Sequence, residues 1–186
     1  MVLSLEPVRS LRLVLPLWTA TDVAAIRGRA EAVVNGGERA PYRSPSGLEW
    51  HRDFPRTDDV DAAWLWREDD PWGPRSIVRG STVLGSIGFF GPPEGDPKDD
   101  AEVPEVEVGY GLVREAWGWG FATEALRALL AETDAMGVRV RAAVRPENKA
   151  SLRVLAKCGF TQLRGSTEDG ELVMARALPL PRPVSP

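Results

Sequence analysis

The chain has 186 residues, of which 43% are hydrophobic and 27% charged, and it carries a formal net charge of −4 at pH 7. This length suits one domain, which we place at residues 1–178, with a core that needs no disulfide or metal. The acidic balance argues against a general nucleic-acid-binding protein, which would carry a basic excess. The apolar run at residues 11–18 is too short to span a membrane, and the single cysteine cannot form an internal disulfide. We therefore expect a soluble, cytoplasmic protein that binds no nucleic acid and no membrane.

The first part of the chain predicts a strand followed by a helix. Residues 11–15 alternate between apolar and other side chains, as a strand does. Thr21 or Asp22 offers a side-chain oxygen that can cap a helix running to about Asn35. Gly36 and Gly37 then supply a stop for that helix.

A loop, a second helix and a hairpin follow. Residues 38–57 are rich in Pro, Gly and Arg and predict a loop. Asp58 can cap a helix that includes residues 61–67. Residues 76–79 and 82–90 are two strand-like segments joined by a Gly-Ser turn, which predicts a hairpin. Residues 91–104 hold four prolines and a cluster of acids, so we expect a surface loop there.

Residues 105–113 return to the period of a strand. Glu105, Glu107 and Gly109 fall on one face of it, so two carboxylates project from the same side. From Ala122 the apolar residues follow helical spacing until Gly137, and residues 138–144 then alternate as a half-buried strand. A strand, a glycine turn, a helix and a strand form a βαβ unit, so the two strands should be parallel.

The C-terminal part predicts a short helix and a last hairpin. The helix lies between Asn148 and Cys158, and Gly159 is placed to end it. Residues 160–164 and 171–177 form the hairpin, and residues 179–186 form a proline-rich tail.

Gly118 and Gly120 introduce the helix that begins near Ala122, and this arrangement is typical of an anion site. Glycines let the backbone approach a ligand, and the amides of the first helical turn point at it. A nucleoside triphosphatase loop is excluded, because Phe121 and Ala122 stand where it needs Lys and Ser or Thr. A dinucleotide fingerprint is a weak match, because Thr123 replaces its third small residue and arginines stand where its acid would be.

Three segments in the correct order resemble the GNAT superfamily of N-acetyltransferases, namely EVGYGLV at 107–113, WGWGFATEA at 117–125 and RPENKASLRVLAKCGF at 145–160. The resemblance is best to the branch that acetylates the N-termini of ribosomal proteins, and it covers roughly residues 76–165. It implies an α/β (α+β) fold with a mixed, mostly antiparallel twisted sheet, one splayed parallel pair of strands and helices on both faces. Acetyl-CoA is then expected in the cleft where the parallel strands separate.

The resemblance also implies which residues bind this cofactor. The backbone of Leu112 and Val113 would pair with the pantetheine arm, and Asn148 and Ser151 look like the family's Asn-x-x-Ser pair. Simple helix capping is the alternative for Asn148 and Ser151. The pyrophosphate would be held by amides of the glycine turn, formed by Trp117, Gly118, Trp119, Gly120, Phe121, Ala122 and Thr123. We expect no metal in the site.

Glu107 is the candidate catalytic base. An alkyl ammonium has a pKa near 10 and an α-amino group near 8, so the acceptor must lose a proton before it attacks a thioester. The family often has Glu at this strand position; Glu105 is the second choice, and a surface ion pair is the alternative for both residues. The Val113 amide is expected to stabilise the thioester oxygen as it gains negative charge.

The proton donor for the leaving thiolate is less defined. Many family members have a tyrosine where this chain has Leu155. Ser151 or a water could donate instead, because a thiol with a pKa of about 8.5 leaves readily.

Four tryptophans surround the second helix, where this family builds its acceptor pocket, and one or two of them are expected to wall that pocket: Trp50, Trp64, Trp66 and Trp72. His51, the only histidine, lies in the preceding loop, and we interpret its place there as chance rather than as a border of the pocket. Trp119 stands where the family has a polar residue. Its indole could cover the pyrophosphate, stack on adenine or pack against the second subunit of a homodimer.

The sequence therefore predicts an acetyl-CoA-dependent N-acetyltransferase that acts on a small-molecule amine or a peptide N-terminus. The alternative is a non-catalytic acyl-CoA sensor or interaction module that has lost its chemistry. The amine acceptor itself is not identified by the sequence.

Overall fold

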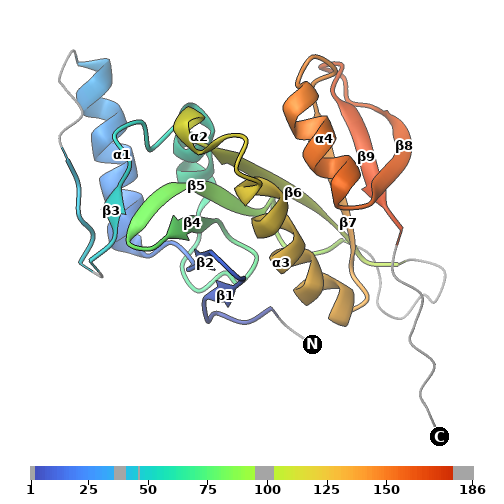
Figure 1. Ribbon diagram of the computed structural model, residues 1–186, viewed down its shortest axis with the longest axis horizontal. Coiled ribbons are helices and arrows are strands. Elements are labelled where there is room, and N and C mark those ends of the chain that lie inside the picture. Colours follow the sequence, from blue (N-terminus) through green and yellow to red (C-terminus); the bar gives the residue numbers. More distant parts are fainter. Residues whose placement is uncertain (1–2, 36–40, 46, 95–102, 178–186) are drawn as a thin grey trace, which may run out of the picture.

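The computed structural model describes residues 3–35, 41–45, 47–94 and 103–177, and its elements are labelled in Figure 1. The helices of this part are α1 (Ala20–Val34), α2 (Thr57–Leu65), the 3-10 helix η1 (Arg114–Ala116), α3 (Phe121–Ala135) and α4 (Lys149–Lys157). The strands are β1 (Val8–Arg9), β2 (Val14–Leu15), β3 (Glu49–Trp50), β4 (Arg75–Arg79), β5 (Thr82–Phe89), β6 (Glu105–Leu112), β7 (Arg139–Val144), β8 (Phe160–Ser166) and β9 (Leu172–Arg176). None of the helices described is long and apolar enough to cross a membrane.

The strands form one mixed sheet with the order β1-β2-β4-β5-β6-β7-β9-β8, and β3 pairs with β5 outside this path. Neighbours along the path are antiparallel except β6 and β7, which are parallel, as the βαβ pattern predicted. Pairing between β6 and β7 runs from Glu105 and Arg139 to Glu107 and Arg141 and then ends. Beyond this point the two strands diverge, with α3 crossing in front of their junction (Figure 1).

The segment from β6 to β9 follows the sequence prediction closely. Residues 105–112 form a strand, Gly137 follows the end of α3 at a φ of +70°, and the last two strands form the expected hairpin. The apolar face of α3 is buried in the core through Ala125, Leu126, Leu129 and Leu130. A buried leucine contributes about 1.5–3 kcal/mol, so this face fixes α3 against the sheet.

The N-terminal predictions need correction at several positions. The cap of α1 is Thr19 rather than Thr21 or Asp22; its side chain accepts from the Asp22 amide while the Asp22 carboxylate accepts from the Thr19 amide. Asp22 therefore completes the capping box three residues into the turn. Asn35 ends the helix, and Gly36 and Gly37 lie outside the described residues.

Three further differences concern short elements. The strand predicted at 11–15 is two short strands, β1 and β2, joined by a turn in which the Ser10 amide donates to Leu13 O. The loop predicted at 38–57 contains β3, whose two residues carry no periodic signal. The cap of α2 is Arg56 rather than Asp58, and the helix ends at Leu65.

Candidate active site

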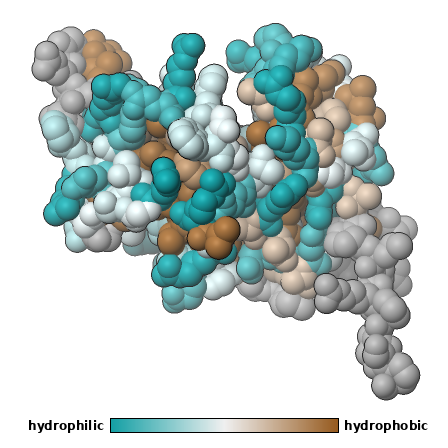
Figure 2. All heavy atoms as spheres, in the orientation of Figure 1, coloured by the Kyte–Doolittle hydropathy of each residue, from teal (hydrophilic) through white to brown (hydrophobic). Residues whose placement is uncertain are grey.

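A cleft of about 720 Å³ opens where β6 and β7 separate. Its walls come from α2, β5, β6, β7 and the start of α4, and they include Glu107, Tyr110, Asn148 and Ser151. Figure 2 shows the surface hollowed between the part that carries α4 and the part that carries α1 and α2. The cleft therefore brings together residues that the sequence analysis took from separate motifs.

Alternate residues of β6 direct their backbone hydrogen-bonding groups to β5, and the residues between them direct theirs to the side of β7. The Val113 amide donates to Leu84 O and the Phe90 amide donates to Glu107 O, so the odd-numbered residues direct their backbone groups to β5. In an antiparallel pair the intervening residues point the other way, which here is toward the gap beside β7. The Leu112 carbonyl accepts from the Trp117 indole at 2.9 Å. The Val113 amide, which we expected to stabilise the thioester oxygen, therefore already donates to Leu84 O. The Leu112 amide is directed at the gap instead.

Glu107 and Glu105 share one face of β6 but differ in surroundings. Glu107 lines the cleft, and its Oε2 lies 3.1 Å from Nε of Arg141. Glu105 is outside the cleft lining and forms ion pairs with Arg139, Arg141 and Arg164. The geometry therefore favours Glu107 over Glu105 as the carboxylate that can meet a ligand.

The glycine turn at the start of α3 has the geometry of an anion cradle. Gly118 and Gly120 have φ values of +81° and +80°, which favour glycine, and a Cβ on Gly118 would meet no atom within 4 Å. The first bond of the helix runs from the Glu124 amide to Gly120 O, so the amides of residues 121–123 have no helical acceptor. A pyrophosphate group fits this turn, since it needs open space and convergent amides.

The other face of β6 meets the start of α4. Asn148 caps α4, with its Oδ1 accepting from the Ser151 amide at 3.0 Å, so the capping interpretation holds for this pair. The Tyr110 hydroxyl lies 2.9 Å from Ser151 Oγ. Burial raises the pKa of Tyr110 to about 12. Sequence analysis did not single out Tyr110, because nothing local connects a strand residue with a helix 41 positions later.

An arginine that lines the cleft was also missed. Arg56 donates to the buried carboxylate of Asp59 from Nε at 2.9 Å and from Nη2 at 2.6 Å, and Ser86 donates to the same carboxylate. The guanidinium lies across Gly111, where a Cβ would fall 1.6 Å from Nη1. Gly111 therefore leaves room for a fixed cation that lines the cleft.

Of the four tryptophans expected around the acceptor pocket, Trp66 lines the cleft, and its indole donates to Trp18 O. Trp50 and Trp72 are buried in the core instead. Trp64 is exposed, with the Arg27 guanidinium 4.5 Å from its ring centroid. Trp119 is 64% exposed beside the glycine turn.

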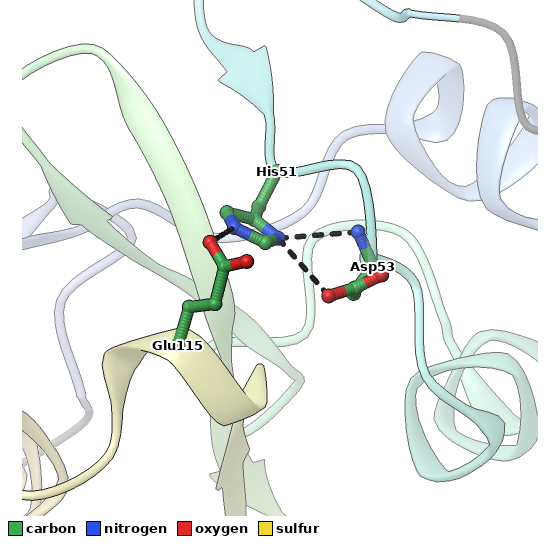
Figure 3. Close-up of side chains that lie close together, drawn as sticks. All are labelled: His51, Asp53 and Glu115. Atoms are coloured by element: carbon green, nitrogen blue, oxygen red, sulfur yellow. Dashed lines mark hydrogen bonds and ion pairs between the residues drawn. The ribbon is translucent and has the colours of Figure 1, made fainter.

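His51 lies outside the cleft lining, where it joins the loop after β3 to η1 (Figure 3). Its Nδ1 accepts from the Asp53 amide at 3.1 Å, so Nε2 carries the proton and donates to Glu115 at 2.9 Å. This hydrogen bond is the main cause that lowers the pKa of Glu115, which also pairs with Arg52. Although His51, Asp53 and Glu115 lie close together, both ring nitrogens already have protein partners, and the arrangement links two loops.

Comparison with known proteins gives a family match over most of the chain. A family described as an acetyltransferase (GNAT) domain matches residues 12–161. The uncharacterized N-acetyltransferase p20 of Bacillus licheniformis is 37% identical over 98 residues, which are 52% of this chain and 51% of that protein. The match thus spans about half the length of this curated relative.

Solved structures share the fold. Mycobacterium smegmatis RimJ, in complex with CoA-disulfide, has a TM-score of 0.59 and 22% identity over 92% of this chain and 87% of that one. A putative ribosomal-protein-serine acetyltransferase from Vibrio cholerae has a TM-score of 0.55 and 16% identity over 96% of this chain and 100% of that one. The expected mixed sheet with a parallel pair is therefore confirmed, and proteins of similar fold include RimJ and one described as a putative ribosomal-protein-serine acetyltransferase.

Proposed function

Because this chain belongs to the GNAT acetyltransferase family, we propose that it transfers the acetyl group of acetyl-CoA directly to the nitrogen of an amine. The observation that carries the proposal is the cleft at the divergence of β6 and β7, with Glu107 in its wall. The glycine turn at the start of α3 is a second feature, outside the lining of this cleft. Together the two features offer backbone donors, an anion site and a carboxylate.

Cofactor binding is assigned to the backbone. The amides of Phe121, Ala122 and Thr123 would hold the pyrophosphate at the positive end of α3, next to Gly118 and Gly120. The backbone groups of Tyr110 and the amide of Leu112 face the gap, and those of Tyr110 would pair with the pantetheine arm, in place of those of Val113. Bound in this way, acetyl-CoA supplies an activated acyl group as a thioester.

Glu107 is assigned the role of general base. It accepts the proton of the ammonium group, directly or through a water, and Arg141 holds its carboxylate in place. The Leu112 amide replaces Val113 as the donor to the thioester oxygen, because the Val113 amide is bonded to Leu84. Ser151 lies at the α4 side of the cleft and donates a hydrogen bond to the departing sulfur.

The acceptor is proposed to be a cationic amine, either a small molecule or a peptide N-terminus. Asp58, Asp61 and Asp70 line the α2 side of the cleft. These carboxylates would attract an ammonium group and orient it before Glu107 takes its proton.

The test is incubation with acetyl-CoA and a panel of amines, with release of free thiol as the measurement. Thiol release that saturates with one amine supports the transferase. A second candidate, a non-catalytic acyl-CoA sensor, is favoured by one observation: Leu155 occupies the family's tyrosine position and is buried in the core. Saturable CoA binding by calorimetry without turnover on any amine would support the sensor and exclude the transferase.

A further inference from the structure

Two hydroxyl groups meet at the α4 side of the cleft. Tyr110 projects from β6, and its Oη lies 2.9 Å from Ser151 Oγ and 3.3 Å from Ser151 O. Both residues line the cleft, and Ser151 stands in the first turn of α4. The contact joins the strand that borders the cofactor gap to the helix that closes it.

Tyr110 and Ser151 carry two hydroxyl protons, and the hydrogen bond between them uses only one of these. Each hydroxyl donates once, and a single bond links the two oxygens. If Tyr110 donates to Ser151 Oγ over the shorter distance, the Ser151 proton remains available to a third atom. Only the hydroxyl protons must turn for this, since the oxygen atoms already lie at hydrogen-bond distance.

The pair also lies on the side of the sheet opposite to the proposed base. Glu107 and Tyr110 are three residues apart on β6, so their side chains project from opposite faces of the strand. An amine adds to the thioester carbonyl, and the thiolate leaves from the tetrahedral intermediate that results. Glu107 and the Ser151 hydroxyl, which both line the cleft, therefore approach the reacting carbon from different sides of β6.

We propose that Tyr110 is a positioning residue that directs the Ser151 hydroxyl at the sulfur of the leaving thiol. This inference rests on the proposed transferase function. As the C–N bond forms, the C–S bond breaks and its electron pair goes to sulfur, which accepts a hydrogen bond from Ser151. Nitrogen loses two protons in all: Glu107 takes the first before the attack and passes it to solvent, then takes the second as the amide forms, and sulfur takes one proton from solvent. Many family members have a tyrosine at the position of Leu155 that donates to the leaving thiolate. Here Tyr110, on a strand, would support the same step through Ser151.

The environment of Tyr110 suits this role. Burial raises the pKa of its hydroxyl to about 12, so the hydroxyl keeps its proton at neutral pH. A hydrogen bond donated by Ser151 would favour the charged form and is the smaller effect, whereas one donated by Tyr110 favours the neutral form. Tyr110 therefore remains a donor under all conditions in which the reaction would run.

The first test measures binding without turnover. The dissociation constants of CoA and desulfo-CoA, which lacks the thiol, are measured by calorimetry at pH 7 and pH 9.5 for wild type, Tyr110→Phe and Ser151→Ala. A thiol has a pKa of about 8.5, so CoA is mostly thiolate at the higher pH. We expect wild type to prefer CoA by about 10-fold at pH 9.5, the magnitude of a hydrogen bond to a charged group, and both variants to lose most of this preference. An unchanged preference in Tyr110→Phe would overturn the proposal.

Tyr42→Phe is the matched control, since Tyr42 is the other tyrosine of the chain and packs against Trp50 at a centroid distance of 4.1 Å. Its preference for CoA should equal that of wild type. A loss in this control as large as that in Tyr110→Phe would also contradict the proposal.

The second test compares acetyl-CoA with its selenoester analogue, whose selenolate leaves without a donor. Tyr110→Phe should lower kcat about 10-fold with the thioester and much less with the selenoester, with KM nearly unchanged. Equal losses with both substrates would assign Tyr110 a purely structural role. If wild type binds CoA but turns over no amine, the proposed function fails, whereas the binding preference still decides the role of Tyr110.

Discussion

Arg56, which lines the cleft, forms a forked ion pair with Asp59, with Nε 2.9 Å from one carboxylate oxygen and Nη2 2.6 Å from the other. The Asp59 side chain is fully buried, so its negative charge is stabilised there only by the positive charge and hydrogen bonds of Arg56 and by Ser86. The Arg56 guanidinium lies across Gly111 and lines the cleft, while Asp59 anchors it from α2.

Replacing Asp59 with Ala should therefore destabilise the protein strongly. Removal of one partner from a buried pair leaves an uncompensated charge and costs about 3–5 kcal/mol. We expect the free energy of unfolding, measured by urea denaturation, to fall by this amount. Asp58→Ala is the control, because the neighbouring carboxylate is 83% exposed and contacts Arg56 only at 3.9 Å. Equal losses in the two variants would contradict the assignment.

Replacing Glu107 with Gln should remove the proposed base. Turnover at neutral pH should fall by a factor of about 10² to 10⁴, while the dissociation constant of CoA stays within about twofold of wild type. Glu171→Gln serves as the control, since Glu171 also lines the cleft but pairs with Arg145 at 3.5 Å. An unchanged rate in Glu107→Gln, measured by thiol release, would exclude this carboxylate.

Replacing Gly120 with Trp should abolish CoA binding, because an indole would fill the cradle at the start of α3. The substitution also strains a backbone with a φ of +80°. Gly170→Trp carries the same strain, since Gly170 has the same φ, and it lies in the turn before β9. Calorimetry should show normal affinity in this control. Retained affinity in Gly120→Trp would place the cofactor elsewhere.

Alkaline unfolding should report the partly buried Tyr110. The pKa of Tyr110 is raised from 10 in the unfolded chain to about 12 in the fold, so its contribution to stability is complete below pH 10. This contribution is lost as pH rises from 10 to 12, by up to about 3 kcal/mol. The decline in the free energy of unfolding over this range should be smaller in Tyr110→Phe than in wild type. Parallel declines in the two proteins would show that the hydroxyl is not held neutral by the fold.

The part of the fold between β6 and α4 could be predicted because its signals are local. Glycines at positive φ mark the turn before α3, and the apolar spacing of α3 is regular over the whole helix. The proposed cofactor cradle rests on the same few residues. Asn148 was found for a similar reason, since an Asn before a helix is both a cap and a family motif.

The remaining site residues depend on contacts between distant segments. Ser86 reaches Asp59 from β5, and Tyr110 reaches Ser151 from β6, at separations of 27 and 41 positions. Asp59 and Asp58 are adjacent acids with the same local propensities, and only tertiary packing makes one of them buried and the other exposed. Similarly, the Val113 amide is not available to the thioester oxygen because it donates to Leu84 O, and this hydrogen bond depends on the register of β5 and β6.

The separation of β6 from β7 places an open strand edge in the middle of the sheet rather than at its border. Open edges are sites where other chains can add a strand and begin aggregation. A ligand arm that lies along this edge would act as a substitute strand and close it. Occupancy of the cleft should therefore slow amide hydrogen exchange at Leu112, raise the melting temperature with ligand concentration and reduce aggregation on heating.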